Sequence, residues 1–180
     1  MNYYALQVKT RSEEKYIRRF NSEYPDVGFK LHFPKRQLYI KKAGKMRSSK
    51  LAVFPGYIFI ESEREEEILN YQLQLKKTDG FYRFLVSNRC LTSLSNKDME
   101  IVHHFISAPN STAGVSKVYF NENSRIVVVE GVLAGLEGRI VKVDKRKGRA
   151  KIRLDLYDDS FTIDLAFEVI SLKEACKKAS

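Results

Sequence analysis

The order of hydrophobic and polar residues predicts alternating strands and helices over residues 1–107. Aromatic and β-branched residues from Tyr3 to Val8 predict a strand, and Thr10 with Glu13 match the capping box that opens a helix. The later elements follow in turn: extended segments over 29–40 and 51–61, a helix over 63–75, a strand over 81–86 and a helix capped within 95–98. This order is the plan of a ferredoxin-like α/β sandwich with one added helix, so the fold class is α+β.

After residue 107 the pattern changes to short strands alone. Residues 108–117 are small and polar without a hydrophobic period, which predicts a flexible linker. Beyond them lie five short segments rich in β-branched residues: 126–129, 138–143, 150–154, 161–165 and 169–170. We expect them to form a small β-barrel over residues 118–175, because closing a short sheet removes its exposed edges.

The segment Leu51–Glu61, LAVFPGYIFIE, is hydrophobic on both faces if it is extended. Helices of the same domain can bury one face completely. We expect the other face to keep exposed aromatic side chains, and hydrophobic patches of that kind mark binding sites for partners.

Charge points to the class of partner. The 180-residue chain carries 32 Lys and Arg against 22 Asp and Glu, a net charge of +10, which favours a polyanion. The excess lies in two segments, 35–50 without any acidic residue and 139–153 with only Asp144. The candidate RNA-binding residues there are Lys35, Arg36, Lys41, Lys42, Lys45, Arg47 and Lys50, and Lys142, Lys145, Arg146, Lys147, Arg149 and Lys151. Exposed basic residues bind phosphates in a salt-sensitive way; a solubilising charged loop is the alternative for each segment.

Enzymatic and metal-binding classes find no support in the pattern. Cys90 and Cys176 lack CxxC spacing, and the adjacent His103 and His104 point about 100° apart on a helix, so they do not converge on a metal. There is no phosphate-binding loop and no dinucleotide fingerprint. We expect a cytoplasmic protein without catalytic activity, cofactor, metal or membrane segment.

Two motifs carry a family resemblance. Arg125–Asp144 places Gly131, Gly135 and Gly138 between β-branched strands and resembles the KOW motif of SH3-like barrels; we expect Gly131 and Gly138 to adopt backbone angles closed to other residues. The run Phe54-Pro55-Gly56-Tyr57 within a strand pair resembles the hallmark of the NusG N-terminal (NGN) domain. Together they make nearly the whole chain similar to the NusG family of transcription elongation factors.

The resemblance implies a partner and a mechanism. In that family the NGN domain grips the clamp helices of the largest catalytic subunit of bacterial RNA polymerase, holds the enzyme closed and suppresses pausing. By position, the resemblance implies polymerase-binding roles for Tyr4, Phe54, Pro55, Tyr57, Phe59, Phe84 and Leu94. It also places the loop of Lys76, Lys77 and Thr78 opposite the second large subunit. The alternatives are that the aromatic residues pack beneath internal helices and that the lysines are only solvated.

The sequence also departs from the general pattern of the family. Tyr3-Tyr4 stands where an aromatic pair beginning with Trp is usual, and Leu133 stands where an aromatic is common on the barrel surface that meets Rho or a ribosomal protein. With the basic segment 35–50, these departures favour a specialised paralogue that resembles the LoaP-type antiterminators, which are recruited to selected operons by a hairpin in the nascent RNA. We expect the chain to be a monomer. A housekeeping factor for pausing and Rho-dependent termination, a paralogue that reads exposed DNA, and a ribosome-associated RNA-binding protein stay open as alternatives.

Overall fold

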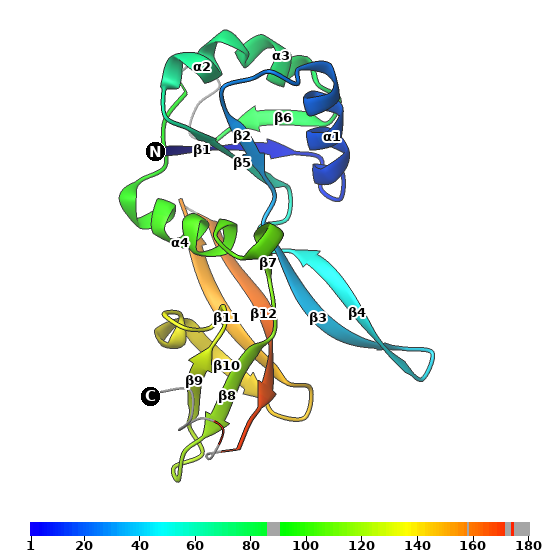
Figure 1. Ribbon diagram of the computed structural model, residues 1–180, viewed down its shortest axis with the longest axis vertical. Helices are drawn as coiled ribbons and strands as arrows, with labels where there is room; N and C mark the ends of the chain where they lie inside the picture. The colour runs from blue at the N-terminus through cyan, green and yellow to red at the C-terminus, as the bar shows by residue number, and fades with distance from the viewer. Residues whose placement is uncertain (86–90, 158, 172–173, 175–180) are drawn as a thin grey trace. The chain divides into compact units, whose positions relative to one another are not determined.

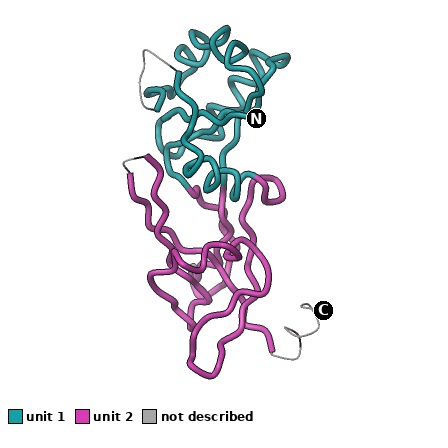
Figure 2. Tube along the Cα trace, turned by 90° about the vertical axis from the view of Figure 1, so that its left-hand side faces the viewer, with its two compact units in different colours: residues 1–34, 54–106 teal, residues 35–53, 107–180 magenta. Residues whose placement is uncertain are grey.

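The computed structural model of the chain describes residues 1–85, 91–157, 159–171 and 174. The chain forms two compact units, one made of residues 1–34 and 54–106 and the other of residues 35–53 and 107–180 (Figure 2). The second unit therefore contains a segment inserted into the sequence of the first. Cys90 and Cys176 lie outside the described residues.

The first unit contains an antiparallel sheet of four strands: β1 (Asn2–Val8), β2 (Lys30–His32), β5 (Tyr57–Ser62) and β6 (Phe81–Phe84). Their order in the sheet is β2-β5-β1-β6 (Figure 1). The two strands that are outermost in the sheet are the second and the last in sequence. This is the ferredoxin-like order, so the predicted fold class is confirmed for this unit.

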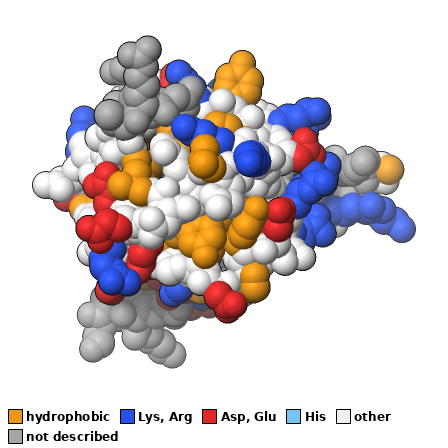
Figure 3. Space-filling model, turned by 90° about the horizontal axis from the view of Figure 1, so that it is seen from above, with side chains coloured by type: hydrophobic (Ala, Val, Ile, Leu, Met, Phe, Trp, Pro, Cys, Tyr) orange, Lys and Arg blue, Asp and Glu red, His pale blue; other side chains and the backbone are white. Residues whose placement is uncertain are grey.

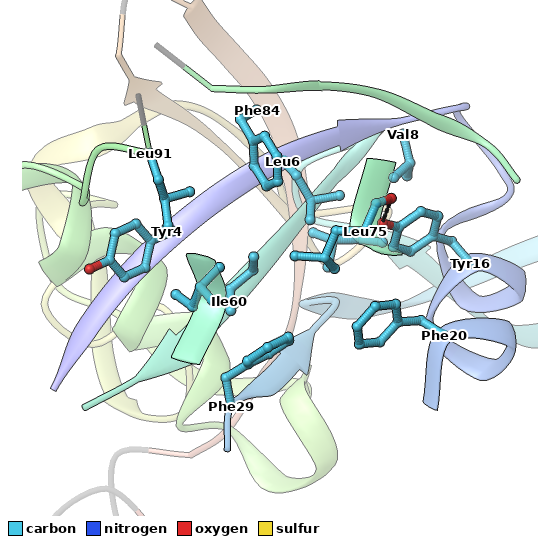
Figure 4. Packing of buried hydrophobic residues seen from close by; sticks show 12 residues of the cluster. Tyr4, Leu6, Val8, Tyr16, Phe20, Phe29, Ile60, Leu75, Phe84 and Leu91 are labelled. Carbon is cyan, nitrogen blue, oxygen red and sulfur yellow. Dashed lines mark hydrogen bonds between the residues drawn. The ribbon is translucent and has the colours of Figure 1, made fainter. Parts of the chain in front are cut away.

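Helices cover both faces of this sheet. The core beneath α1 (Glu13–Glu23), α2 (Glu65–Asn70) and α3 (Gln72–Lys77) includes Ile58 and Ile60 of β5 (Figure 4). There the Tyr16 hydroxyl donates a hydrogen bond of 2.7 Å to the carbonyl of Leu75. The predicted single helix over 63–75 is two short helices that meet at Tyr71. No helix of the described part of the chain is long and apolar enough to cross a membrane.

The fourth helix, α4 (Asn96–Ile106), lies on the opposite face of the sheet (Figure 1). Its start is capped as predicted, because the Ser95 hydroxyl accepts a hydrogen bond of 3.2 Å from the backbone N–H of Asp98. Ile101, Val102 and Phe105 form its buried side.

The second unit contains a sheet of five strands: β8 (Ser116–Phe120), β9 (Ile126–Glu130), β10 (Ile140–Asp144), β11 (Arg149–Leu156) and β12 (Asp159–Val169). Their order is β10-β11-β12-β8-β9, and only the β12–β8 pair is parallel. This is the predicted C-terminal β domain, called the barrel below. Two strand assignments were wrong: β8 was missed, and the segments predicted at 161–165 and 169–170 are not separate strands, because β12 runs without a break through residues 161–165 to its end at Val169.

The inserted segment is a long hairpin of β3 (Lys35–Lys42) and β4 (Lys45–Ala52), called the basic hairpin below. Next to it, β7 (Thr112–Ala113) pairs in parallel with the start of β3. Residues 108–117, expected to be a linker, thus include η1 (Pro109–Ser111), β7 and the start of β8. Main-chain hydrogen bonds therefore join β3 of the basic hairpin to β7, a strand in the segment that leads into the barrel.

The tip of the basic hairpin offers a way to stabilise it. Ala43 and Gly44 both have positive φ, 49° and 77°, the pattern of a type I′ turn. Because Asn tolerates this conformation better than Ala, Ala43→Asn should raise the free energy of unfolding by up to about 1 kcal/mol. Urea denaturation would measure the change. Ser48→Asn, within β4 of the same hairpin, should bring no such gain.

Candidate functional site

The Phe54-Pro55-Gly56-Tyr57 turn is held by the junction of β1 and α1. Gly56 has φ +82°, and its N–H donates a hydrogen bond of 2.7 Å to Oε1 of Glu13, whose side chain is buried. The carbonyl of Gly56 accepts a hydrogen bond of 2.8 Å from Val8 N–H. The predicted capping box was therefore wrong, because Ser12 is the N-cap of α1 and the Glu13 carboxylate is used by the turn.

The strand register separates the predicted polymerase-binding residues onto two faces of the sheet. Tyr4 pairs with Ile60, and Leu6 pairs with Phe84, all in the core beneath α1, α2 and α3. By alternation, Tyr57 and Phe59 of β5 point to the other face. One partner surface therefore cannot contact all of these side chains at once.

The second face is covered by α4, so the expectation of exposed aromatic side chains there was wrong. The Phe54 ring makes edge contacts with Phe59 at 5.4 Å and with Phe105 of α4 at 6.0 Å between centroids, and Tyr3 contacts His103 at 6.0 Å. Pro55 is exposed. The other six residues are buried: Tyr4, Phe54, Tyr57, Phe59, Phe84 and Leu94.

A row of polar side chains lies on the same face as Tyr57. Gln7 donates a hydrogen bond of 2.5 Å from Nε2 to the Tyr57 hydroxyl, and Arg83 donates one of 2.6 Å from Nε to Oε1 of Gln7. Arg83 and its neighbour Tyr82 are exposed. We call Tyr57, Gln7 and Arg83 the polar row. Sequence reasoning missed Gln7 and Arg83, although the polar residue near the end of β1 was a visible signal.

The loop predicted to face a second subunit is partly structural. Thr78 is buried, and its Oγ1 donates a hydrogen bond of 2.9 Å to the carbonyl of Gln74, which closes α3. Lys77 is exposed, whereas the Lys76 ammonium lies 5.9 Å from the centre of the Phe84 ring. The next residue, Asp79, pairs with Lys15 and Arg19 of α1, and the Lys15 contact is the main cause of its lowered pKa. Among the three predicted residues, Lys77 is the most available for a partner.

The basic hairpin divides its charged residues between two faces. The register sets Gln37 opposite Lys50, Tyr39 opposite Ser48 and Lys41 opposite Met46, so these residues share one face. The main candidates on this face are Lys35, Lys41 and Lys50, beside Tyr39, whose side chain is 44% exposed. We call it the Tyr39 face. Figure 3 shows Lys and Arg side chains gathered where Figure 1 places the projecting end of the hairpin.

The opposite face attaches the basic hairpin to the barrel at its inner end. Leu38 is buried there, and the Arg36 guanidinium donates a hydrogen bond to the carbonyl of Ala52. Burial lowers the pKa of Arg36. Arg149 of β11 donates a hydrogen bond of 2.6 Å to the carbonyl of Tyr39. Arg36 thus has a structural contact, although it was predicted to bind RNA.

The remaining hairpin candidates lie near the tip. Lys45 and Arg47 are exposed on the face opposite Tyr39, and the side chain of Lys42 lies outside what the structure describes. The six basic residues of this run whose side chains are described therefore form two sets of opposite orientation.

The barrel candidates also separate. Lys142, Lys147, Arg149 and Lys151 surround one hollow together with Asp144 and Asp164. The ammonium of Lys145 instead lies 3.9 Å from the centre of the Phe120 ring. Arg146 is exposed in the turn between β10 and β11.

The glycines of the predicted KOW turn have different roles. Gly131 and Gly135 have φ of +101° and +82°, but Gly138 has no positive φ and lies in the short helix η2 (Glu137–Arg139). The expectation for Gly138 was therefore wrong. Leu133 is fully buried, and its N–H donates a hydrogen bond of 3.0 Å to Oγ of Ser116. Its side chain consequently adds nothing to the barrel surface.

Comparison with known proteins links these features to one family. The family model described as "Transcription termination factor nusG" matches residues 1–103. "Transcription termination/antitermination protein NusG" of Helicobacter pylori strain 26695 is 22% identical over 171 residues, covering 92% of this chain and 94% of its own. The protein of the same description from Thermus thermophilus is 23% identical over 182 residues, covering 94% and 97%. The structure "Domain interaction in Thermotoga maritima NusG" aligns with a TM-score of 0.53 at 16% identity, covering 92% of this chain and 93% of the other, which supports the fold.

Proposed function

Because the chain belongs to the NusG family, we propose that it binds bacterial RNA polymerase in the cytoplasm and suppresses pausing and termination at selected operons. In this proposal it is recruited as a monomer by a hairpin in the nascent RNA, as in the LoaP-type specialisation. The observation that supports recruitment to selected operons is the Tyr39 face, where three lysines lie beside an exposed aromatic ring. The chain would act as a binding factor and not as an enzyme.

The polymerase contact is assigned to the polar row and the exposed Pro55 beside it. Tyr57, Gln7 and Arg83 are already linked by hydrogen bonds, so their positions are held before any partner arrives. A charged donor at the open end of the row is suited to an acidic or carbonyl-rich helix surface. The buried Phe54 and Phe59 would shape this surface from below without touching the partner.

The RNA contact is assigned first to the Tyr39 face. Unpaired bases of an RNA loop stack on aromatic side chains, and every base has a face that can do so. Lys41 and Lys50 lie on the same face as the Tyr39 ring and are exposed. They would neutralise phosphates on either side of a stacked base.

A general elongation and termination factor is the second candidate, and the comparisons favour it on one point. The relatives described as termination/antitermination proteins align with this chain over nearly their whole length, 94% and 97% of each. Against direct coupling to Rho or a ribosomal protein stands Leu133, whose buried side chain is absent from the barrel surface.

Single-round transcription through an intrinsic terminator tests the proposal. The template would carry the leader that precedes this protein's own operon, with a leader-free template in parallel. We expect readthrough that depends on the leader and is lost both in Arg83→Glu, which reverses charge at the polar row, and in Lys41→Gln/Lys50→Gln. Arg83, Lys41 and Lys50 are exposed, so these variants should fold normally.

The matched control is Arg18→Gln, a change at an exposed position of α1 that belongs to neither the polar row nor the Tyr39 face. It should retain full readthrough. Equal readthrough with and without the leader would favour the general factor, and no effect of the protein on either template would contradict polymerase-linked antitermination altogether.

A further inference from the structure

The outer face of the barrel contains a small basic hollow beside the basic hairpin. It measures about 130 Å³ and is lined by Lys142, Asp144, Lys147, Arg149, Lys151 and Asp164. A single water needs only roughly 10–15 Å³, so a larger polar group fits. The strand register explains the convergence, since Lys142 pairs with Lys151, Lys151 with Asp164, and Asp144 with Arg149 across β10, β11 and β12.

Four cationic side chains and two carboxylates leave this hollow with an excess of positive charge. The carboxylates hold the cations loosely, because Lys147 lies 3.8 Å from Asp144, Lys151 3.8 Å from Asp164 and Arg149 3.9 Å from Asp164. These distances exceed those of charge-assisted hydrogen bonds, which are about 2.7–2.9 Å. Donor groups of the cations thus remain available to an anion that enters.

Arg149 has a buried donor group that the described residues leave without a hydrogen-bond partner. Its Nη2 is used by the carbonyl of Tyr39 at 2.6 Å, and its Nη1 faces Asp164. Its Nε is buried and has no hydrogen-bond partner within the described part of the chain. Buried donors are normally paired, so this one marks a place where an acceptor is expected.

We propose that this hollow binds a backbone phosphate of a nucleic acid, with Lys142, Lys147, Arg149 and Lys151 as its ligands. The inference deepens the proposed function and rests on its assignment of RNA as a partner. Arg149 both lines the hollow and binds the main chain of Tyr39, so the phosphate site is next to the strand that carries the Tyr39 ring. A strand of nucleic acid whose phosphate occupies the hollow can continue along the basic hairpin.

The basic residues of segment 139–153 also differ in their surroundings. Four of them line the hollow, whereas Lys145 lies over the Phe120 ring and Arg153 pairs with Asp155 at 3.4 Å. On a diffuse basic surface, each of these residues would contribute equally to the affinity for nucleic acid. The phosphate site predicts that charge removed from the hollow weakens binding more than the same charge removed elsewhere.

The test measures binding of the full chain to labelled single-stranded RNA and DNA of the same sequence, about 16 nucleotides long. Fluorescence anisotropy between about 50 and 200 mM salt gives both the affinity and its salt dependence. Lys147→Gln/Lys151→Gln should weaken binding several-fold and reduce the slope of log K against log salt by about 0.7, the value for one phosphate of a single strand.

Two further variants separate charge at the site from net charge and from misfolding. Arg18→Gln/Lys97→Gln removes the same charge from exposed positions of the first unit and should leave both affinity and slope close to wild type. Asp164→Asn removes a carboxylate from the wall of the hollow and should tighten binding, a change that a folding defect does not produce.

The two nucleic acids distinguish the natural source of the phosphate. RNA and DNA should lose affinity for Lys147→Gln/Lys151→Gln by the same factor, because a phosphate site does not sense the 2′-hydroxyl. The nucleic acid that the wild-type protein binds more tightly is identified as the natural source of the phosphate. Wild-type binding by this variant, an equal loss in the control variant, or a loss with only one nucleic acid would overturn the proposal. The assay contains no polymerase, so its result is independent of whether leader-dependent readthrough is found.

Discussion

Phe59→Ala is expected to lower the free energy of unfolding by about 3–5 kcal/mol, the usual cost of removing a buried aromatic ring. The Phe59 side chain is fully buried, and its ring packs against Phe54, which in turn contacts Phe105 of α4. The cavity left by the ring lies between the sheet and α4, so the loss should appear as a lower urea midpoint with an unchanged m-value.

Arg83→Ala provides the matched comparison, because Arg83 lies on the same face but is exposed. We expect its effect on stability to stay within about 0.5 kcal/mol. A Phe59→Ala variant as stable as wild type would show that α4 does not cover the sheet in solution. The comparison also decides how transcription assays are interpreted, since a loss of activity in Phe59→Ala would report unfolding and not a lost polymerase contact.

Gly131→Ala is expected to destabilise the barrel by more than about 2 kcal/mol. Gly131 has φ +101°, which L-residues rarely adopt, and a Cβ there would lie 2.6 Å from Cα of Ser116. The obstacle is backbone of β8, so it cannot rotate away as a side chain would. Thermal unfolding followed by circular dichroism would measure the loss.

Gly138→Ala is the control within the same predicted turn. Gly138 has no positive φ, and a Cβ there would meet nothing within 4 Å. Its substitution should therefore be nearly neutral, within about 0.5 kcal/mol. Equal destabilisation by both changes would contradict the backbone geometry of this turn.

The sheet of the first unit could be predicted from the sequence because its signal is local. The alternation in Tyr3–Val8 and in Tyr57–Ser62 assigns each side chain to a face, and the order of elements identifies the ferredoxin-like plan. The strand Ser116–Phe120 was missed because it directly follows small polar residues, and its first two residues were assigned to the linker over 108–117.

The candidate site was less predictable because it depends on packing between distant elements. Nothing in the sequence of Leu51–Glu61 indicates that a helix formed by residues 96–106 covers the second hydrophobic face of this segment. The sequence also shows Arg36 and Lys41 as equal members of one basic run. Only the hairpin register and the Ala52 carbonyl distinguish the structural arginine from the exposed lysine.

The basic hairpin has a consequence for how this protein can be divided or recombined. It leaves the first unit after Pro34 and returns at Phe54, yet it pairs with β7 and is bonded to Arg149. A fragment that ends near residue 107 would keep the hairpin but lose β7, which pairs with β3, and β12, which contacts it. The two units are thus not interchangeable modules. Exchange of the C-terminal part between paralogues would succeed only if the inserted hairpin were exchanged with it.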